Sequence, residues 1–321
     1  MIAESICAHW RVIITAFALA ITGCSGNNDG PRIIVSGASG QLGGLVVEAL
    51  LARDVPASDL ILVSRTPERL ESYAALGASV RFGDFTQPDS LRAAYAEGER
   101  MLLISVGGGA GDRPALHKAA IDAAREAGVG YIAYTSYVNV DLIPDSPIAP
   151  DHLATEQLLR DSGLAWTMLR NHLYMNGLVE QAATAARSGE LRSSVPADSR
   201  VAYVTREDCA AAAAAVLFTP GHEYQTYNIT GPELIGPREI AETTAAVTGV
   251  PVQHIVVNEE DAYRALVDSG VGERVAAAMI GLERELGSPY LQQTSNAVLN
   301  LTGRPPMSLR ELLQAHKAEL L

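Results

Sequence analysis

The chain has 321 residues, which is enough for two modest domains or for one α/β domain with an additional lobe. Hydrophobic residues make up 48% of the chain and charged residues 19%, a composition typical of a folded globular protein that excludes an intrinsically disordered chain. The net charge of −13, from 24 basic and 37 acidic residues, argues against general binding to a nucleic-acid backbone. A local basic pocket for one phosphate group stays compatible with that charge.

Residues 1–30 have the pattern of a secretory leader. The uncharged apolar stretch of residues 12–21 is shorter than the roughly 20 residues that a helix needs to span a bilayer. The sequence Ile-Thr-Gly-Cys that ends at Cys24 resembles the lipobox of bacterial lipoproteins, in which the cysteine carries the lipid, and the polar residues 25–30 would form a tether. Lipid attachment at Cys24, and with it anchoring in the bacterial cell envelope, is therefore one expectation. The alternative is a misassigned start and a cytoplasmic protein.

A strand, a glycine-rich turn and a helix follow this leader. Residues 32–36 form an apolar run typical of a buried parallel strand, residues 37–44 are rich in glycine, and residues 45–51 have helical apolar spacing. Glycine permits positive φ angles and lets backbone N–H groups approach a pyrophosphate at the helix N-terminus. A turn without a ligand is the alternative, but a second strand at residues 60–65 completes a βαβ unit and favours dinucleotide binding. The predicted cofactor contacts in the turn are Gly37, Ala38, Ser39, Gly40, Gln41 and Leu42.

The end of the second strand predicts which dinucleotide binds. A site specific for NADH places Asp or Glu there to hold the ribose 2′-hydroxyl, whereas this chain has Ser64 and Arg65. A guanidinium fits a 2′-phosphate through two parallel hydrogen bonds, so the sequence favours NADPH over NADH. The alternative is that Arg65 is only a solvated charge that caps a helix.

Strands and helices keep alternating as far as residue 177. The further strands and helices that we expect are residues 79–84, 88–97, 101–105, 114–128, 131–136, 150–162 and 165–169. This alternation predicts an α/β fold with a Rossmann-type doubly wound parallel sheet, in a dinucleotide-binding domain of residues 31–177. Ligands of such sheets bind beyond the carboxyl ends of the strands. The residues expected to line that crevice are Gly37, Arg65, Asp84, Ser105 and Ser136.

Residues 178–321 are expected to form a smaller, mostly helical lobe that covers the crevice. Residues 201–206 and 226–232 have strand character, and we expect these two segments to pack back on the main domain. The helices expected in this half are residues 178–188, the alanine run from about 206, and residues 238–247, 259–269 and 309–320.

The scarcity of lysine limits the chemistry. Short-chain dehydrogenases that act on alcohols use Tyr-x-x-x-Lys, in which the lysine lowers the pKa of the tyrosine. The only lysines are Lys118 and Lys317, and neither has a tyrosine four residues before it. Tyr137 lies near the expected place, but Asp141 follows it at that spacing and would raise a tyrosine pKa. The sequence therefore predicts a hydride acceptor that needs little help with protonation, such as a quinone.

Other reaction classes lack their motifs. The chain has no Gly-x-Ser-x-Gly elbow, no His-Glu-x-x-His, no Cys-x-x-Cys and no Walker lysine. These absences argue against the commonest hydrolases, metal sites and NTPases, and no metal is predicted. Two polar clusters remain. His152 and Glu156 share one face of a helix, where the carboxylate could orient the imidazole, and residues 170–176 follow a strand end. For each cluster the alternative to a pocket role is ordinary helix-face or loop chemistry.

Several of these segments together resemble one family, the NmrA-like atypical short-chain dehydrogenases, and within it the NADPH-dependent quinone oxidoreductases. The residues that carry the resemblance are Ile34–Gly43, Val63–Pro67, Gly83–Phe85, His117, Tyr134–Ser136, His152 with Glu156, and Leu169–Asn171. The resemblance implies an NADPH-binding Rossmann domain, a small C-terminal lobe and a quinone cleft between them.

The resemblance also implies roles for single residues. It implies cofactor contacts at Asp84 and Phe85. Related reductases carry lysine where His152 stands, so His152 is the candidate proton donor or pocket residue. Tyr137 and Asn171 would flank the nicotinamide as the other candidate catalytic residues. The candidate substrate-pocket residues are Glu156 and Tyr174.

The predicted function is hydride transfer from NADPH to a quinone or a similar small electrophile. A non-catalytic NADP(H) sensor of the NmrA type is the alternative from another class, because some members of the family only bind the dinucleotide. A third possibility is an envelope lipoprotein whose Rossmann fold has lost its cofactor. Cofactor binding, and oxidation of bound NADPH by an added quinone, separate the three.

Overall fold

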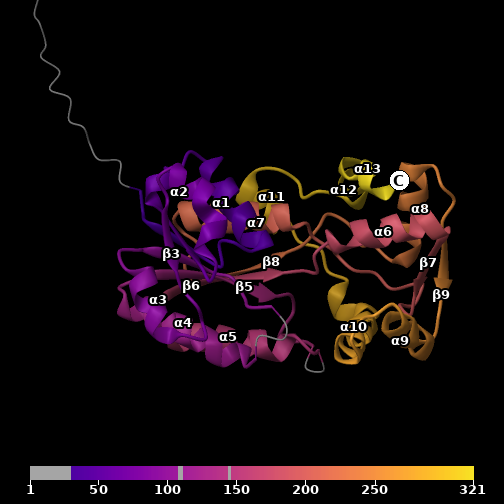
Figure 1. The fold of residues 1–321 in the computed structure, drawn as a ribbon, viewed down its shortest axis with the longest axis horizontal. Coiled ribbons are helices and arrows are strands. Elements are labelled where there is room, and N and C mark those ends of the chain that lie inside the picture. The colour runs from indigo at the N-terminus through magenta and orange to yellow at the C-terminus, as the bar shows by residue number, and fades with distance from the viewer. Residues whose placement is uncertain (1–29, 108–110, 144–145) are drawn as a thin grey trace, which may run out of the picture.

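A parallel seven-stranded sheet forms the centre of the molecule in the computed structural model, which describes residues 30–107, 111–143 and 146–321 (Figure 1). Its strands are β1 (Ile33–Ser36), β2 (Leu60–Ser64), β3 (Ser79–Phe82), β4 (Arg100–Leu103), β5 (Tyr131–Tyr137), β6 (Ala165–Asn171) and β8 (Gln225–Ile229). They lie in the order β3-β2-β1-β4-β5-β6-β8 with every neighbouring pair parallel. The Rossmann-type α/β fold predicted from the sequence is confirmed.

The central strands form because their residues are apolar on both faces. All four residues of β1 and all seven residues of β5 are buried. In the register of the sheet, Ile34 lies between Ile61 of β2 and Met101 of β4, and all three side chains are fully buried. Helices on both faces of a parallel sheet account for this double burial.

Two helical layers cover the sheet (Figure 1). Figure 1 shows α1, α2, α7 and α11 on one side of the strands and α3, α4 and α5 on the other. The helices of these layers are α1 (Gln41–Leu51), α2 (Glu71–Ala75), α3 (Pro88–Tyr95), α4 (Arg113–Glu126), α5 (Ala149–Asp161), α7 (Arg206–Phe218) and α11 (Ala297–Thr302), with short 3-10 turns η1 (Ala57–Asp59) and η2 (Pro67–Leu70).

The alanine-rich helix α7 packs on the first domain although it follows residue 177. Its small side chains lie against α1 and share one core cluster with Val46 and Leu50. The strand β8 likewise adds to the main sheet beside β6. Between Val201 and Val204 the structure has single bridges, to Ile235 and Tyr174, rather than the continuous strand that the sequence suggested. The chain thus crosses between the two halves more than once.

The second region has an apolar core centred on α6 and α8, and Tyr137 and Val138 at the end of β5 belong to the same cluster. A parallel pair of short strands, which the sequence did not predict, borders it. None of the helices in the described parts of the chain is long and apolar enough to cross a membrane. The elements of this region are α6 (Gly177–Ser188), β7 (Glu190–Ser193), α8 (Pro237–Thr248), β9 (Gln253–Val256), α9 (Glu259–Asp268), α10 (Glu273–Leu286), η3 (Pro289–Leu291), α12 (Leu309–Ala315) and α13 (Lys317–Leu320).

Candidate active site

The glycine turn between β1 and α1 is built for close backbone approach. Gly37 has a backbone φ of 94°, which residues with a side chain rarely adopt. A Cβ atom on Gly43 would lie 2.2 Å from the carbonyl oxygen of Gly37, so only glycine fits there. Gly40 is the N-cap of α1 and supplies no side-chain cap, which leaves the positive end of the helix open to an anion. The turn therefore fits the pyrophosphate of a dinucleotide.

A cluster of hydroxyl groups lies beside this turn at the end of β2. Ser39 Oγ is 2.6 Å from Ser64 Oγ and 3.3 Å from Thr66 Oγ1, and the Thr66 N–H donates to Ser64 Oγ. Arg65 and Arg69 are exposed next to the cluster. None of the ion pairs among the described residues includes either guanidinium. Hydroxyl donors and free guanidinium groups suit a phosphate.

Asp84 and Phe85 follow β3 at the same edge of the sheet. The Asp84 carboxylate accepts hydrogen bonds from the Thr86 N–H and hydroxyl, both at 2.9 Å. Burial raises the pKa of Asp84, but these bonds and the nearby Arg65 guanidinium outweigh burial and hold the pKa below its ordinary value. Phe85 packs edge-on against His117. In this structure the Asp84 carboxylate mainly shapes its own loop.

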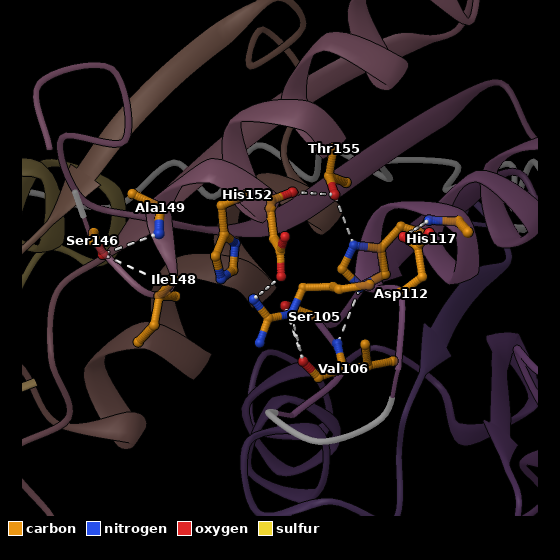
Figure 2. Close-up of polar contacts among 12 residues, drawn as sticks. Ser105, Val106, Asp112, His117, Ser146, Ile148, Ala149, His152 and Thr155 are labelled. Carbon is orange, nitrogen blue, oxygen red and sulfur yellow. Dashed lines mark hydrogen bonds and ion pairs between the residues drawn. The ribbon is translucent and has the colours of Figure 1, made fainter. Parts of the chain in front are cut away.

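His117 fixes the segment after β4, where Ser105 lies. The Val106 N–H donates to His117 Nε2 at 3.1 Å, so the proton of the neutral ring is on Nδ1 and donates to Thr155 Oγ1 at 2.9 Å (Figure 2). Arg113 donates to the Val106 carbonyl oxygen at 3.0 Å. The Ser105 N–H donates to Thr135 Oγ1 at 2.9 Å, and the Ser105 hydroxyl donates to the Val106 carbonyl oxygen at 3.5 Å.

His152 points into the same network from α5 (Figure 2). Its Nδ1 lies 2.8 Å from Tyr134 Oη, so Tyr134 orients the ring, and the expected orientation by Glu156 is wrong. Burial, followed by the charge of Arg113, lowers the pKa of His152 from 6.5 to about 3. His152 is therefore a neutral imidazole near pH 7, and as a proton donor it could act only through a neutral N–H.

Glu156 is occupied by an ion pair rather than facing a pocket. Its side chain has no exposed surface, and its two carboxylate oxygens each lie 2.9 Å from a nitrogen of Arg170. Arg160 and the Ser136 hydroxyl also donate to it, at 2.8 and 2.7 Å. A fully buried carboxylate requires this many donors, so the predicted pocket role of Glu156 is corrected to a structural one. The proton of the Ser136 hydroxyl is used by Glu156, and the predicted cofactor contact of Ser136 stays a prediction.

Tyr137 contacts a residue that the sequence did not indicate. Its hydroxyl donates to Glu285 Oε1 at 2.8 Å, and the Ser146 hydroxyl donates to Glu285 Oε2 at the same distance. Glu285 belongs to α10, in the second region, and is 7% exposed. Burial and the Glu285 carboxylate raise the pKa of Tyr137. Asp141, which the sequence placed against Tyr137, instead pairs with Arg170 at 3.0 Å.

Asn171 and Tyr174 lie together just after β6. Asn171 Nδ2 donates to Tyr174 Oη at 3.4 Å, while Asn171 Oδ1 is buried and accepts no hydrogen bond from any described residue. The guanidinium of Arg206 lies 4.9 Å from the centre of the Tyr174 ring. An unpartnered buried acceptor at this edge fits an N–H group of a ligand.

The comparisons with known proteins agree with this geometry. A family model described as NAD(P)H-binding matches residues 37–220, from the glycine turn to the end of α7. The chain belongs to this NAD(P)H-binding, NmrA-like family. Quinone oxidoreductase 2 of Escherichia coli (strain K12) is 33% identical over 279 residues, which cover 87% of this chain and 96% of the relative. An NAD(P)H azoreductase of Xenophilus azovorans is 29% identical over 288 residues, covering 89% and 98%.

Solved structures of the same family carry the cofactor. The triphenylmethane reductase of Citrobacter sp. complexed with NADP(H) superposes with a TM-score of 0.83 at 35% identity, covering 88% of this chain and 99% of that chain. The NADPH complex of an NADPH-dependent quinone oxidoreductase of Escherichia coli gives a TM-score of 0.83 at 32% identity, covering 89% and 99%. The chain is an NAD(P)H-binding oxidoreductase of this family, and the predicted family and cofactor are confirmed.

Cys24 and the rest of the leader lie outside the described residues, so lipid attachment stays a prediction. Within the described residues there is no group of three or more His, Cys, Asp or Glu side chains that could hold a metal ion.

The imidazoles of His117 and His152 are expected to stay neutral from about pH 5 to about pH 8. Burial lowers both pKa values to about 3, so neither ring gains a proton in that range. Nuclear magnetic resonance of the ring nitrogens as a function of pH measures this directly. A midpoint near 6.5 for His152 would contradict the buried, Tyr134-bound geometry.

Proposed function

We propose that the protein transfers a hydride from NADPH to a quinone or to a similar electron-poor small molecule. The observation that carries this proposal is that neither of the two candidate proton donors among the described residues at the predicted hydride site, Tyr137 and His152, is poised to release a proton. The Tyr137 hydroxyl donates to Glu285, and His152 is neutral. Such a site favours an acceptor whose charge is delocalised after reduction, and an electron-poor quinone meets that condition. The names of the relatives, a quinone oxidoreductase and an azoreductase, support this substrate class.

The residues at the glycine turn would hold the NADPH phosphates. The open N-terminus of α1 would receive the pyrophosphate, and Arg65 with the hydroxyls of Ser39 and Thr66 would receive the 2′-phosphate. Bound there, NADPH supplies the hydride. Because no acidic residue replaces Arg65 at the end of β2, the phosphate-bearing dinucleotide is favoured over NADH.

The nicotinamide end would lie near the carboxyl ends of β5 and β6. Asn171 offers its unpartnered Oδ1 to a carboxamide N–H, and Tyr137 forms a wall that Glu285 holds in place. His152 lines the same end as an uncharged ring, tilted against Tyr137 with the ring centres 6.0 Å apart. These residues position and desolvate the acceptor rather than protonate it.

Titration of the purified protein with NADPH and NADH, followed by addition of a simple benzoquinone, tests the proposal. Preferential binding of NADPH with loss of the absorbance of the reduced nicotinamide after quinone addition is the expected result. Binding without oxidation would assign the chain to the alternative function, an NADP(H) sensor. If neither dinucleotide binds, the cofactor role of the glycine turn is overturned.

Replacing Tyr137 by phenylalanine is expected to lower kcat by less than about tenfold. A general acid normally contributes about 10²- to 10⁴-fold, but the Tyr137 hydroxyl is engaged by Glu285 and is not needed by a quinone. Steady-state kinetics with benzoquinone measures the effect, and Tyr224→Phe, at an exposed tyrosine before β8, is the control. A loss of about a thousandfold would show that Tyr137 is the proton donor after all.

The proposed lipid anchor can be tested by mass. Expression of the full chain in a bacterium is expected to yield a protein that begins at Cys24 and carries a diacylglyceryl group. The variant Cys24→Ser is expected to lack that mass. A wild-type chain that starts before residue 24 without lipid would favour the cytoplasmic alternative.

A further inference from the structure

A pocket of about 130 Å³ lies within the second region, away from the glycine turn. It is bordered by α6, β7, α8 and α10, which share the apolar core of that region. Most of its lining is aliphatic: Leu178, Leu191, Val201, Ile235, Ile240 and Leu286. An apolar cavity of about 150 Å³ in another protein is large enough for benzene, so this pocket has the size of a single six-membered ring.

Two hydroxyl groups of the pocket lining have no partner among the described residues. Ser199 is 4% exposed, and its Oγ is buried without a hydrogen bond. Tyr203 is 8% exposed, and none of the hydrogen bonds among the described residues uses its hydroxyl. Burial and the charge of Glu283 raise the pKa of Tyr203, so that its hydroxyl stays a donor. The buried Ser199 hydroxyl without a partner is costly, and a ligand oxygen in the pocket would satisfy it together with the Tyr203 hydroxyl.

Two further polar side chains of the lining, Ser193 and Glu283, already have hydrogen-bond partners. Ser193 Oγ lies 3.1 Å from His254 Nε2, and the Glu283 carboxylate accepts from the N–H and hydroxyl of Ser194. No Lys, Arg or His is among the described residues that line the pocket, whereas Glu283 brings a negative charge. The pocket therefore disfavours anions.

We propose that this pocket binds a small uncharged molecule with one ring and one hydroxyl or carbonyl oxygen, and that Ser199 and Tyr203 bind this oxygen. The aliphatic lining covers the ring, and the oxygen accepts from or donates to the two free hydroxyls. Tyr203 and Tyr137 belong to the same apolar core cluster, so the pocket lies near the Tyr137 wall of the proposed crevice. The site does not depend on NADPH or on the reductase activity proposed above.

Binding of phenol, toluene and benzoate to the purified full-length protein without cofactor tests this site. The three probes share one ring and differ in the attached group. Phenol is expected to bind about three- to tenfold more tightly than toluene, the effect of one or two neutral hydrogen bonds. Benzoate is expected to bind at least about tenfold more weakly than phenol, because its charge finds no basic partner. Methyl resonances of Val201, Ile235 and Ile240 should shift with phenol and toluene.

Matched variants locate the oxygen. In the variants Ser199→Ala and Tyr203→Phe, the ratio of the phenol affinity to the toluene affinity should be smaller than in the wild type. The affinity for toluene should stay at the wild-type value. Ser199→Ala should fold normally, since it removes a hydroxyl that has no partner. Ser193→Ala, whose hydroxyl is already bound to His254, should keep the preference. Equal affinities for the three probes, a preference unchanged in both test variants, or no shift of the methyl resonances would overturn the proposal.

Discussion

Replacing Arg65 by alanine is expected to weaken NADPH binding about 10- to 100-fold and to leave NADH binding almost unchanged. Arg65 is exposed at the end of β2, beside the hydroxyls of Ser39, Ser64 and Thr66, and is free of ion pairs with other described residues. A guanidinium bound to a phosphate contributes about 1.5–3 kcal/mol, and only NADPH offers that phosphate here. Fluorescence titration of each dinucleotide measures both affinities.

A surface arginine supplies the control for this effect. Arg92→Ala removes an exposed arginine of α3 with no described ion pair, and the affinities for both cofactors should stay within about twofold of wild type. An equal loss of NADPH and NADH affinity in Arg65→Ala would mean that Arg65 supports the fold of the turn. No loss at all would leave Arg65 as a solvated helix-capping charge.

Replacing Glu156 by glutamine is expected to lower the free energy of unfolding by about 3 kcal/mol. Glu156 has no exposed side-chain surface and Arg170 only 11%, so the variant leaves a nearly buried guanidinium without its closest carboxylate. Asp141→Asn is the matched control, because Asp141 contacts the same guanidinium but is 55% exposed. This control substitution should lower the free energy of unfolding by less than about 1 kcal/mol. Chemical denaturation of both variants gives the comparison, and equal losses would contradict the buried pair.

The pH dependence of stability follows from the same groups. Burial raises the pKa of Glu156, but the hydrogen bonds from Arg170 and Ser136 outweigh burial and lower the pKa below 4.5. The contribution of Glu156 to the free energy of unfolding is therefore present above pH 4.5 and is lost as the pH falls. His117 and His152 have pKa values of about 3 when folded and about 6.5 when unfolded, so stability already begins to fall below pH 6.5. The difference in the free energy of unfolding between wild type and Glu156→Gln should therefore become smaller only below pH 4.5. A difference that narrows near pH 6.5 would contradict the assignment to Glu156.

Much of the first domain could be predicted from the sequence because its signals are local. An apolar run such as Ile33–Val35 is long enough for one buried strand, and the glycines that follow it serve a turn whose geometry the chain must adopt nearby. The short strands β7 and β9 lack such signals. Their residues alternate or repeat only weakly, and pairing with distant segments stabilises them.

The partners of the site residues could not be predicted in the same way. The spacing of His152 and Glu156 correctly places both on one helix face, but that face meets β5 and β6, where Tyr134 and Arg170 are better partners. Glu285 lies 148 residues after Tyr137, and no local pattern links the two. Long-range contacts of this kind depend on how the two regions pack, which a local pattern does not contain.

Single-turnover oxidation of NADPH bound to the protein is the most direct measurement of the proposed hydride transfer. Mixing the complex with benzoquinone should remove the absorbance of the reduced nicotinamide in one phase, and deuterium at the transferred position of NADPH should slow that phase. Bound NADPH that stays reduced in the presence of excess quinone would contradict hydride transfer to this class of acceptor.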